Sequence, residues 1–229
     1  MTIAEALVAV RERIALAAGR SGRDASTVKL VAVSKGKSVE AIREACASGQ
    51  RLFGENYAQE LDEKARALID LGIEWHFIGH LQTNKAKIVA RCAHVVHTVH
   101  SPELAAELGK RATAAGRPRL PVLVEVKLSD EASKHGVPPS ALGELLDVID
   151  HDHRLRLCGL MTMPPIGEGI TQRIFEELAA LRTRHGGASR LPELSMGMTG
   201  DFESAIACGA TIVRVGTAIF GDRESRSLA

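Results

Sequence analysis

Short apolar runs rich in valine, leucine and isoleucine alternate with segments of helical spacing along almost the whole chain. This alternation constrains the fold most, because strands joined through helices pair in parallel. The runs with strand character are residues 28–34, 52–56, 73–79, 94–99, 121–128, 155–163, 194–198 and 211–217. The helical patterns between them are residues 39–49, 58–71, 84–90, 101–115, 140–150, 170–185 and 201–208.

Eight strand–helix units are the number that closes a parallel barrel, whereas doubly wound open sheets usually have fewer strands. The sequence therefore predicts an α/β fold: a single (β/α)8 TIM barrel, one domain over residues 1–229. Residues 218–229, after the last run, are too few for a full helix. We expect an extra N-terminal helix, over residues 1–20, to fill that gap in the outer ring.

Charge and composition exclude several classes of protein. Lys and Arg number 29 against 28 for Asp and Glu, so no charge excess indicates nucleic acid or an anionic membrane as a partner. The N-terminus lacks the pattern of a signal peptide, and no apolar run approaches the roughly 18 residues of a membrane helix. Four scattered cysteines without metal-ligand spacing favour reduced thiols and a cytoplasmic protein; they are Cys46, Cys92, Cys158 and Cys208.

Lys35 follows the first strand run, and in a parallel barrel the active site lies at the carboxyl ends of the strands. It shares the parity of Val31 and Val33, so it points into the barrel if they do. A desolvated lysine has a lowered pKa and becomes a nucleophile toward carbonyl groups. The alternative is a lysine that extends to solvent, and Lys37, two residues on, is a rival nucleophile.

Two glycine-containing segments after the seventh and eighth runs resemble a phosphate site. They are residues 195–199, which hold Ser195 and Gly197, and the pair Gly216 and Thr217. Small residues let the backbone approach an anion, and barrels often bind phosphate with these two loops. The alternative is that Gly197 and Gly216 only permit tight turns.

Arg214 lies within the last apolar run, and a buried arginine must be paired. Glu125 or Glu55 could pair with it, or it could donate to a ligand. The sequence HVVHTVH over residues 94–100 offers three histidines. Their spacing places neighbours on opposite faces of a strand, which disfavours a metal site.

Several segments together resemble the YggS/PROSC family of pyridoxal 5′-phosphate (PLP) binding homeostasis proteins, over nearly the full length. They are VAVSKGKS at 31–38, FGENYAQE at 53–60, WHFIGHLQTNK at 75–85, GLMTMPP at 159–165, the Lys134/Gly136 pair, and the long segment 194–221. The resemblance implies an alanine-racemase-like barrel without that enzyme's second domain. Gly36 and His80 depart from the usual residues, which puts the shape of two loops in doubt.

The resemblance also implies roles for single residues. PLP would form a Schiff base with Lys35, and its phosphate would contact Ser195, Gly216 and Thr217. Arg214 would lie beside the pyridine nitrogen, and Asn56 near the ring. The same cradle includes Gly197.

PLP chemistry narrows the function. Arginine can only donate to the ring nitrogen, so the ring is a weak electron sink and general PLP catalysis is disfavoured. Tyr57, the only tyrosine, is expected to turn away from the ring, which leaves His80 as a second base. We therefore expect a monomeric, non-enzymatic PLP carrier for vitamin B6 homeostasis, with PLP-dependent apoenzymes as recipients. The alternatives are a weak amino-acid racemase and a lyase or aldolase that uses Lys35 on a sugar phosphate.

Overall fold

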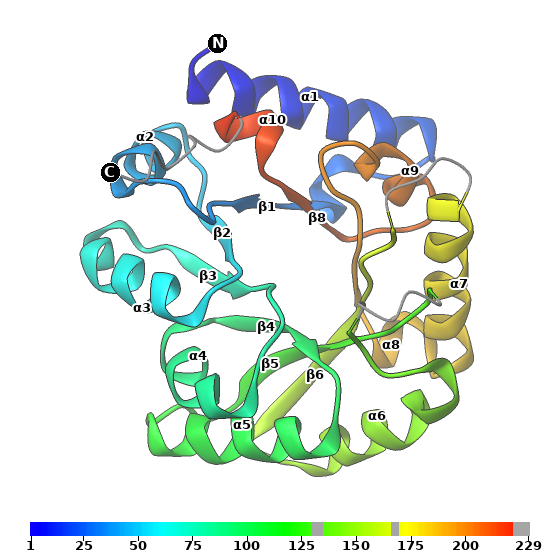
Figure 1. The fold of residues 1–229 in the computed structure, drawn as a ribbon. Helices are drawn as coiled ribbons and strands as arrows, with labels where there is room; N and C mark the ends of the chain where they lie inside the picture. The colour runs from blue at the N-terminus through cyan, green and yellow to red at the C-terminus, as the bar shows by residue number, and fades with distance from the viewer. Residues whose placement is uncertain (130–134, 166–169, 222–229) are drawn as a thin grey trace.

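Eight parallel strands close into a barrel, in sequence order, in the computed structural model of the chain (Figure 1). The structure describes residues 1–129, 135–165 and 170–221. Strand β1 pairs with β2 on one side and with β8 on the other, which closes the ring. The strands are β1 (Lys29–Val33), β2 (Leu52–Glu55), β3 (Glu74–Phe77), β4 (Val95–Val99), β5 (Leu120–Glu125), β6 (Leu155–Met161), β7 (Glu193–Ser195) and β8 (Ile212–Val215).

Helices surround the barrel, as the alternation of the sequence predicted (Figure 1). The α-helices are α1 (Ile3–Arg20), α2 (Val39–Ala47), α3 (Ala58–Ala67), α4 (Ala86–Cys92), α5 (Pro102–Ala114), α6 (Leu142–His151), α7 (Ile170–Arg184), α8 (Gly187–Arg190), α9 (Phe202–Ala207) and α10 (Thr217–Phe220). Short 3₁₀ turns are η1 (Ala25–Thr27), η2 (Ile69–Leu71), η3 (Thr83–Lys85) and η4 (Pro139–Ala141).

The N-terminal helix completes the outer ring. Helix α1 packs against α2, α9 and α10, over the side of the barrel that β1 and β8 form (Figure 1). It begins with a capping box in which Thr2 and Glu5 bond each other's backbone N–H groups. Its buried face includes Leu7, Val10 and Ile14. This packing confirms the predicted extra helix.

The core has two parts. A large apolar cluster lies between the strands and the helices, and a smaller one fills the barrel around Val31, Leu123 and Ile212. Gly54 allows close packing in the barrel, because a Cβ there would lie 2.9 Å from the terminal methyl of Ile78 and 3.0 Å from a methyl of Val31. Buried polar side chains also lie in the interior, among them His97, Ser195 and Arg214.

Element boundaries differ from the predictions at strand ends. Strands β3, β6 and β8 end two residues before the apolar runs that predicted them, because the chain turns into the loops at the barrel mouth. The prediction that residues 211–217 form a strand is wrong at its end, because Gly216 caps α10 and Thr217 begins that helix. The predicted helix 58–71 ends at Ala67 and continues as η2. None of the helices in the described ranges combines the length and apolar character needed to cross a membrane.

Candidate functional site

A pocket of about 810 Å³ opens at the carboxyl ends of the strands, where β1, β7 and β8 meet the loops that follow them. It brings together Lys35 from the first strand end, Arg214 from the last strand, and the starts of two short helices. The described residues that line it are Val33, Lys35, Pro164, Pro165, Thr171, Gln172, Met198, Thr199, Gly200, Asp201, Ser204, Arg214, Gly216 and Thr217.

Lys35 is partly buried and lies two residues beyond β1, in the pocket with Val33. Its orientation agrees with the alternation that placed it on the inward face of the strand. The rival lysine, Lys37, is directed elsewhere. Its ammonium group donates to the carbonyl oxygens of Phe220 and Gly221, each at 3.0 Å, at the carboxyl end of α10.

A buried ionic network fixes the peptide on both sides of Lys35. The Lys64 ammonium donates to the Ser34 carbonyl at 2.6 Å and to carboxylate oxygens of Glu55 and Glu60 at 2.7 and 2.6 Å. The Ser34 hydroxyl also donates to Glu55 at 2.7 Å, and the backbone N–H of Gly36 donates to Glu60 at 2.6 Å. The segment that carries the lysine is therefore anchored before and after it.

The electrostatics of this network depend on both charges. Burial raises the pKa of the Glu55 carboxyl, and the nearby Lys64 ammonium opposes that shift. The side chains of Lys64 and Glu55 are 6% and 0% exposed, so each charge depends on the other for compensation.

The opposite wall of the pocket is suited to an anion. Gly216 and Thr217 begin α10, and the first N–H groups of a helix have no partner within it. Thr199 and Gly200, in the loop after β7, face the same space, and the hydroxyls of Thr217 and Thr199 lie 3.1 Å apart. Asp201 occupies the N-cap position of α9, but its carboxylate accepts the Met198 N–H at 2.6 Å rather than a helical one.

Gly197 has a packing role. Its φ of +93° favours glycine, and a Cβ there would lie 2.6 Å from the Cβ of Ala205 and 2.9 Å from the Cα of Phe202. Its carbonyl accepts the backbone N–H of Arg214 at 3.0 Å. Gly197 therefore lets α9 lie close to the strand end, and it does not line the pocket. This placement agrees with the tight-turn alternative.

Arg214 is 3% exposed and is held by two bonds on its buried side. It donates to the Ser195 hydroxyl at 2.7 Å and to the Thr162 carbonyl at 3.0 Å. Burial lowers the pKa of its guanidinium to about 10, and the charge of Glu125 opposes that shift. Glu55, the other suggested partner, pairs with Lys64 instead.

Ser195 lies behind Arg214 and does not line the pocket. Its hydroxyl, fully buried, contacts Arg214 on one side and the Nδ1 of His97 at 2.9 Å on the other. The structure therefore places Ser195 between Arg214 and His97, and not among the described residues that line the pocket.

Asn56 follows β2 and is partly buried, and its Oδ1 atom is buried without a hydrogen-bond partner. A buried amide oxygen without a donor is rare, and Asn56 is not among the described residues that line the pocket. Its neighbour Tyr57 is 56% exposed at the start of α3. The predicted outward turn of Tyr57 agrees with this position.

The remaining histidines divide between the barrel interior and its mouth. His97 points into the barrel, whereas His94 is exposed and accepts the Trp75 N–H. The exposed His80 ring stacks on those of His100 and His135, with centroids 5.1 and 3.5 Å away. It is not among the described residues that line the pocket. Across the described ranges, no three His, Cys, Asp or Glu side chains gather to hold a metal. Lys134 lies outside those ranges.

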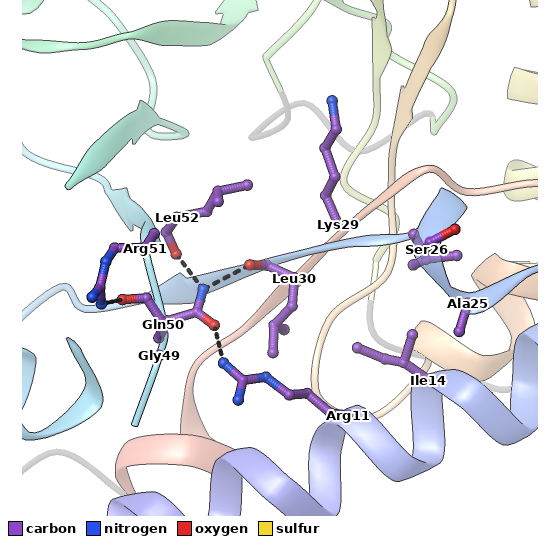
Figure 2. Close-up of a pocket in the computed structure, with 11 residues that line it drawn as sticks. Arg11, Ile14, Ala25, Ser26, Lys29, Leu30, Gly49, Gln50, Arg51 and Leu52 are labelled. Carbon is purple, nitrogen blue, oxygen red and sulfur yellow. Dashed lines mark hydrogen bonds between the residues drawn. The ribbon is translucent and has the colours of Figure 1, made fainter. Parts of the chain in front are cut away.

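A second depression, of about 430 Å³, lies at the amino ends of β1 and β2 (Figure 2). Its most buried polar side chain, Gln50, donates to the Leu30 and Leu52 carbonyls at 2.8 and 2.7 Å and accepts from Arg11 at 3.2 Å. These bonds tie the two strands to α1. Because the depression's central polar group is already satisfied by the protein, the pocket at the opposite end is the stronger candidate for a ligand site.

The chain is similar to known proteins over nearly its full length. The family model "Alanine racemase, N-terminal domain" matches residues 6–224. The pyridoxal phosphate homeostasis protein of Escherichia coli K12 is 43% identical over 97% of each chain, and that of Aquifex aeolicus is 42% identical over 98% of this chain and 100% of its own.

Solved structures also resemble this chain. PipY of Synechococcus elongatus with PLP bound superposes with a TM-score of 0.82 at 38% identity, over 96% of this chain and all of that one. Alanine racemase from Corynebacterium glutamicum, at 18% identity and a TM-score of 0.66, shares the fold; the match covers 97% of this chain and 63% of that one.

The fold and pocket define an alanine-racemase-type barrel with a lysine at its mouth. Within that class, the chain belongs to the pyridoxal phosphate homeostasis protein family.

Sequence reasoning missed Lys64 and His76, two buried residues that support the site. Lys64 pairs with Glu55 beside the loop of Lys35, and His76 contacts His97 behind Ser195. The signal for Lys64 was weak, because a lysine in a polar helical segment normally faces water. The sequence indicated the burial of His76 more clearly, because this residue lies within an apolar strand run.

Proposed function

We propose that this protein binds PLP in the pocket at the carboxyl ends of the strands, as a Schiff base on Lys35, and serves vitamin B6 homeostasis as a carrier. The observation that carries this proposal is the convergence of three donor types in one pocket. Lys35 provides an amine, the start of α10 at Gly216 and Thr217 provides N–H groups, and Arg214 provides a guanidinium. PLP requires one of each, for its aldehyde, phosphate and ring nitrogen.

We also assign Asn56 to a position near the ring. Its buried Oδ1 has no hydrogen-bond partner, but the residue is not among the described residues that line the pocket. PLP, once bound, supplies an aldehyde that forms reversible imines with amines. The Lys35 amine would attack that aldehyde carbon, and water would leave as the C=N bond forms.

We assign the phosphate to Gly216, Thr217, Thr199 and Gly200, on the strength of their shared wall in the pocket. Ser195 would act through Arg214. This assignment modifies the expectation that Ser195 touches the phosphate, and it keeps Gly216 and Thr217. Gly197 would shape the loop without contacting the cofactor.

The side chains that line the pocket support a carrier role. Arg214 has a pKa of about 10, so it stays charged at neutral pH and offers only donors to a ring nitrogen. A ring nitrogen without a proton withdraws few electrons from a substrate. The described residues that line the pocket include neither a tyrosine nor a histidine as a second base. These features disfavour the racemase alternative and also the lyase alternative.

We further propose a cytoplasmic, single-domain monomer that delivers PLP to apoenzymes. The four cysteines are free thiols, which suits a reducing compartment.

The test is titration of the purified protein with PLP. We expect one equivalent to bind with a visible absorption band that Lys35→Ala lacks. Binding without that band in the unaltered protein would overturn the proposal.

A further inference from the structure

A chain of polar side chains runs through the barrel interior, from Arg214 toward the amino ends of the strands. The Nδ1 of His97 lies 2.9 Å from the Ser195 hydroxyl that Arg214 contacts. The Nε2 of His97 lies 2.7 Å from the Nδ1 of His76. The Nε2 of His76 in turn lies 3.2 Å from a carboxylate oxygen of Glu74, within reach although off the ideal hydrogen-bond angle.

This chain of polar side chains is buried from solvent along most of its length. Ser195 and His97 are 0% exposed and His76 is 2% exposed, whereas the Glu74 side chain is 47% exposed at the start of β3. Buried polar atoms are satisfied by protein partners where water is excluded. Each group between the two ends therefore has to find its donor and its acceptor within the chain.

The chemistry of the two ends fixes the direction of every bond. A guanidinium can only donate, and an ionised carboxylate can only accept. Glu74 is ionised at neutral pH, because the neighbouring His76 ring lowers the pKa of its half-exposed carboxyl. His76 therefore carries its proton on Nε2 and accepts at Nδ1. His97 then donates from Nε2 and accepts at Nδ1, and Ser195 donates to it.

The opposite direction fails at Ser195. A charged His76 would donate to His97, which would then donate to the Ser195 hydroxyl. That hydroxyl would accept from both His97 and Arg214, and its own proton would have no acceptor bonded to it in the part of the chain that the structure describes. Burial also holds the pKa of His97 well below its usual range, so that ring stays neutral.

We propose that Ser195, His97, His76 and Glu74 form a one-way hydrogen-bond chain that positions Arg214 as a donor to the ring nitrogen of the cofactor. Each member donates toward Glu74, so Ser195 always presents a lone pair to Arg214. The guanidinium keeps its remaining N–H groups for the pocket. This inference rests on the proposed function, because it assigns the ring end of PLP to Arg214.

The hydrogen-bond chain explains why His76 and His97 are buried in the barrel, which neither metal binding nor apolar packing explains. They are positioning residues, because they act through Ser195 and Arg214 rather than on the ligand itself. Glu74, at the other end of the hydrogen-bond chain, is a positioning residue too. The polar interior noted above then follows from the need to orient one guanidinium.

The first test reads the proton positions directly, by long-range ¹H–¹⁵N NMR of the unaltered protein at neutral pH. We expect both His97 and His76 to be neutral rings protonated on Nε2. His76→Asn and His97→Asn assign the two sets of signals, and His94→Asn is the control, because His94 lies outside the hydrogen-bond chain. A ring protonated on Nδ1, or a doubly protonated ring, at either position would overturn the proposal. This measurement needs no cofactor, so it stands even if PLP binding to Lys35 fails.

The second test uses a matched pair of variants of similar size, His97→Leu and His97→Asn. Leucine removes the acceptor for Ser195, whereas the asparagine amide oxygen can replace Nδ1. We expect His97→Leu to raise the PLP dissociation constant about tenfold, the loss of one charge-assisted hydrogen bond, and His97→Asn to retain affinity within about threefold.

A PLP analogue with carbon in place of the ring nitrogen separates positioning from general damage. It cannot accept a hydrogen bond from Arg214, so His97→Leu should change its dissociation constant by less than about twofold. Equal losses of affinity for PLP and for the analogue would contradict the proposed hydrogen-bond chain. Equal losses of PLP affinity in the leucine and asparagine variants would contradict it as well. Absence of the Lys35 band in the unaltered protein would instead refute the proposed function.

Discussion

Lys64→Met tests whether the buried ionic network anchors the segment that carries Lys35. The Lys64 ammonium makes three short bonds, to the Ser34 carbonyl and to carboxylate oxygens of Glu55 and Glu60. Its loss leaves Glu55, fully buried, with a single bond from the Ser34 hydroxyl. Breaking one side of a buried pair costs about 3–5 kcal/mol, a large part of the roughly 5–15 kcal/mol that stabilises a typical domain.

The pH dependence of that loss has a definite sign. Burial raises the pKa of Glu55, and removal of Lys64 raises it further. A carboxyl with a raised pKa in the folded state stabilises the fold below its unfolded pKa and loses that contribution as pH rises through the folded value. The stability gap between Lys64→Met and the unaltered protein should therefore be smaller at about pH 5 than at about pH 8.

Urea denaturation at both pH values measures this gap. The matched control is Lys64→Met with Glu55→Gln, which removes both charges and should recover much of the loss. PLP affinity should also fall in the single variant, because the peptide before Lys35 loses its anchor. A loss below about 1 kcal/mol, or one that does not vary with pH, would refute the argument.

Three further predictions concern the proposed phosphate contacts, the turn at Gly197 and catalytic turnover. Thr217→Val with Thr199→Val should weaken binding of PLP more than of pyridoxal, because each hydroxyl contact with phosphate is worth about 1.5–3 kcal/mol; equal losses in binding titrations would place the phosphate elsewhere. Gly197→Ala should lower the free energy of unfolding by about 2–4 kcal/mol through strain and overpacking, and an unchanged urea midpoint would contradict this. In D₂O, NMR should show Cα proton exchange of L-alanine slower than about 1 s⁻¹; faster exchange, especially if lost in His80→Ala, would indicate a racemase.

The barrel and the position of Lys35 could be predicted because both depend on local patterns. Alternation of period two places Val31, Val33 and Lys35 on one face, and repeated strand–helix units require a parallel sheet. Arg214 could be placed in the interior by the same reasoning. Its partners could not, because Ser195 ends β7, Thr162 follows β6, and the sequence offered Glu125 and Glu55 as equally good candidates.

Long-range contacts explain the other differences. Lys64 belongs to a polar helix, and only the approach of the Ser34 loop buries it. Thr217 continued an apolar run that ends at Val215, where Gly216 turns the chain into α10. His97 was weighed as a metal ligand because its spacing along one strand was visible, whereas its partner His76 on β3 was not.

The measurement that tests the account most directly is borohydride reduction of the PLP-loaded protein, followed by peptide mapping. Reduction makes the bond between PLP and its lysine permanent, so the modified peptide identifies the nucleophile. We predict the added mass on the peptide that contains Lys35, at one equivalent, and none in Lys35→Ala. Modification confined to Lys37 or Lys134, with Lys35 unmodified, would contradict the account.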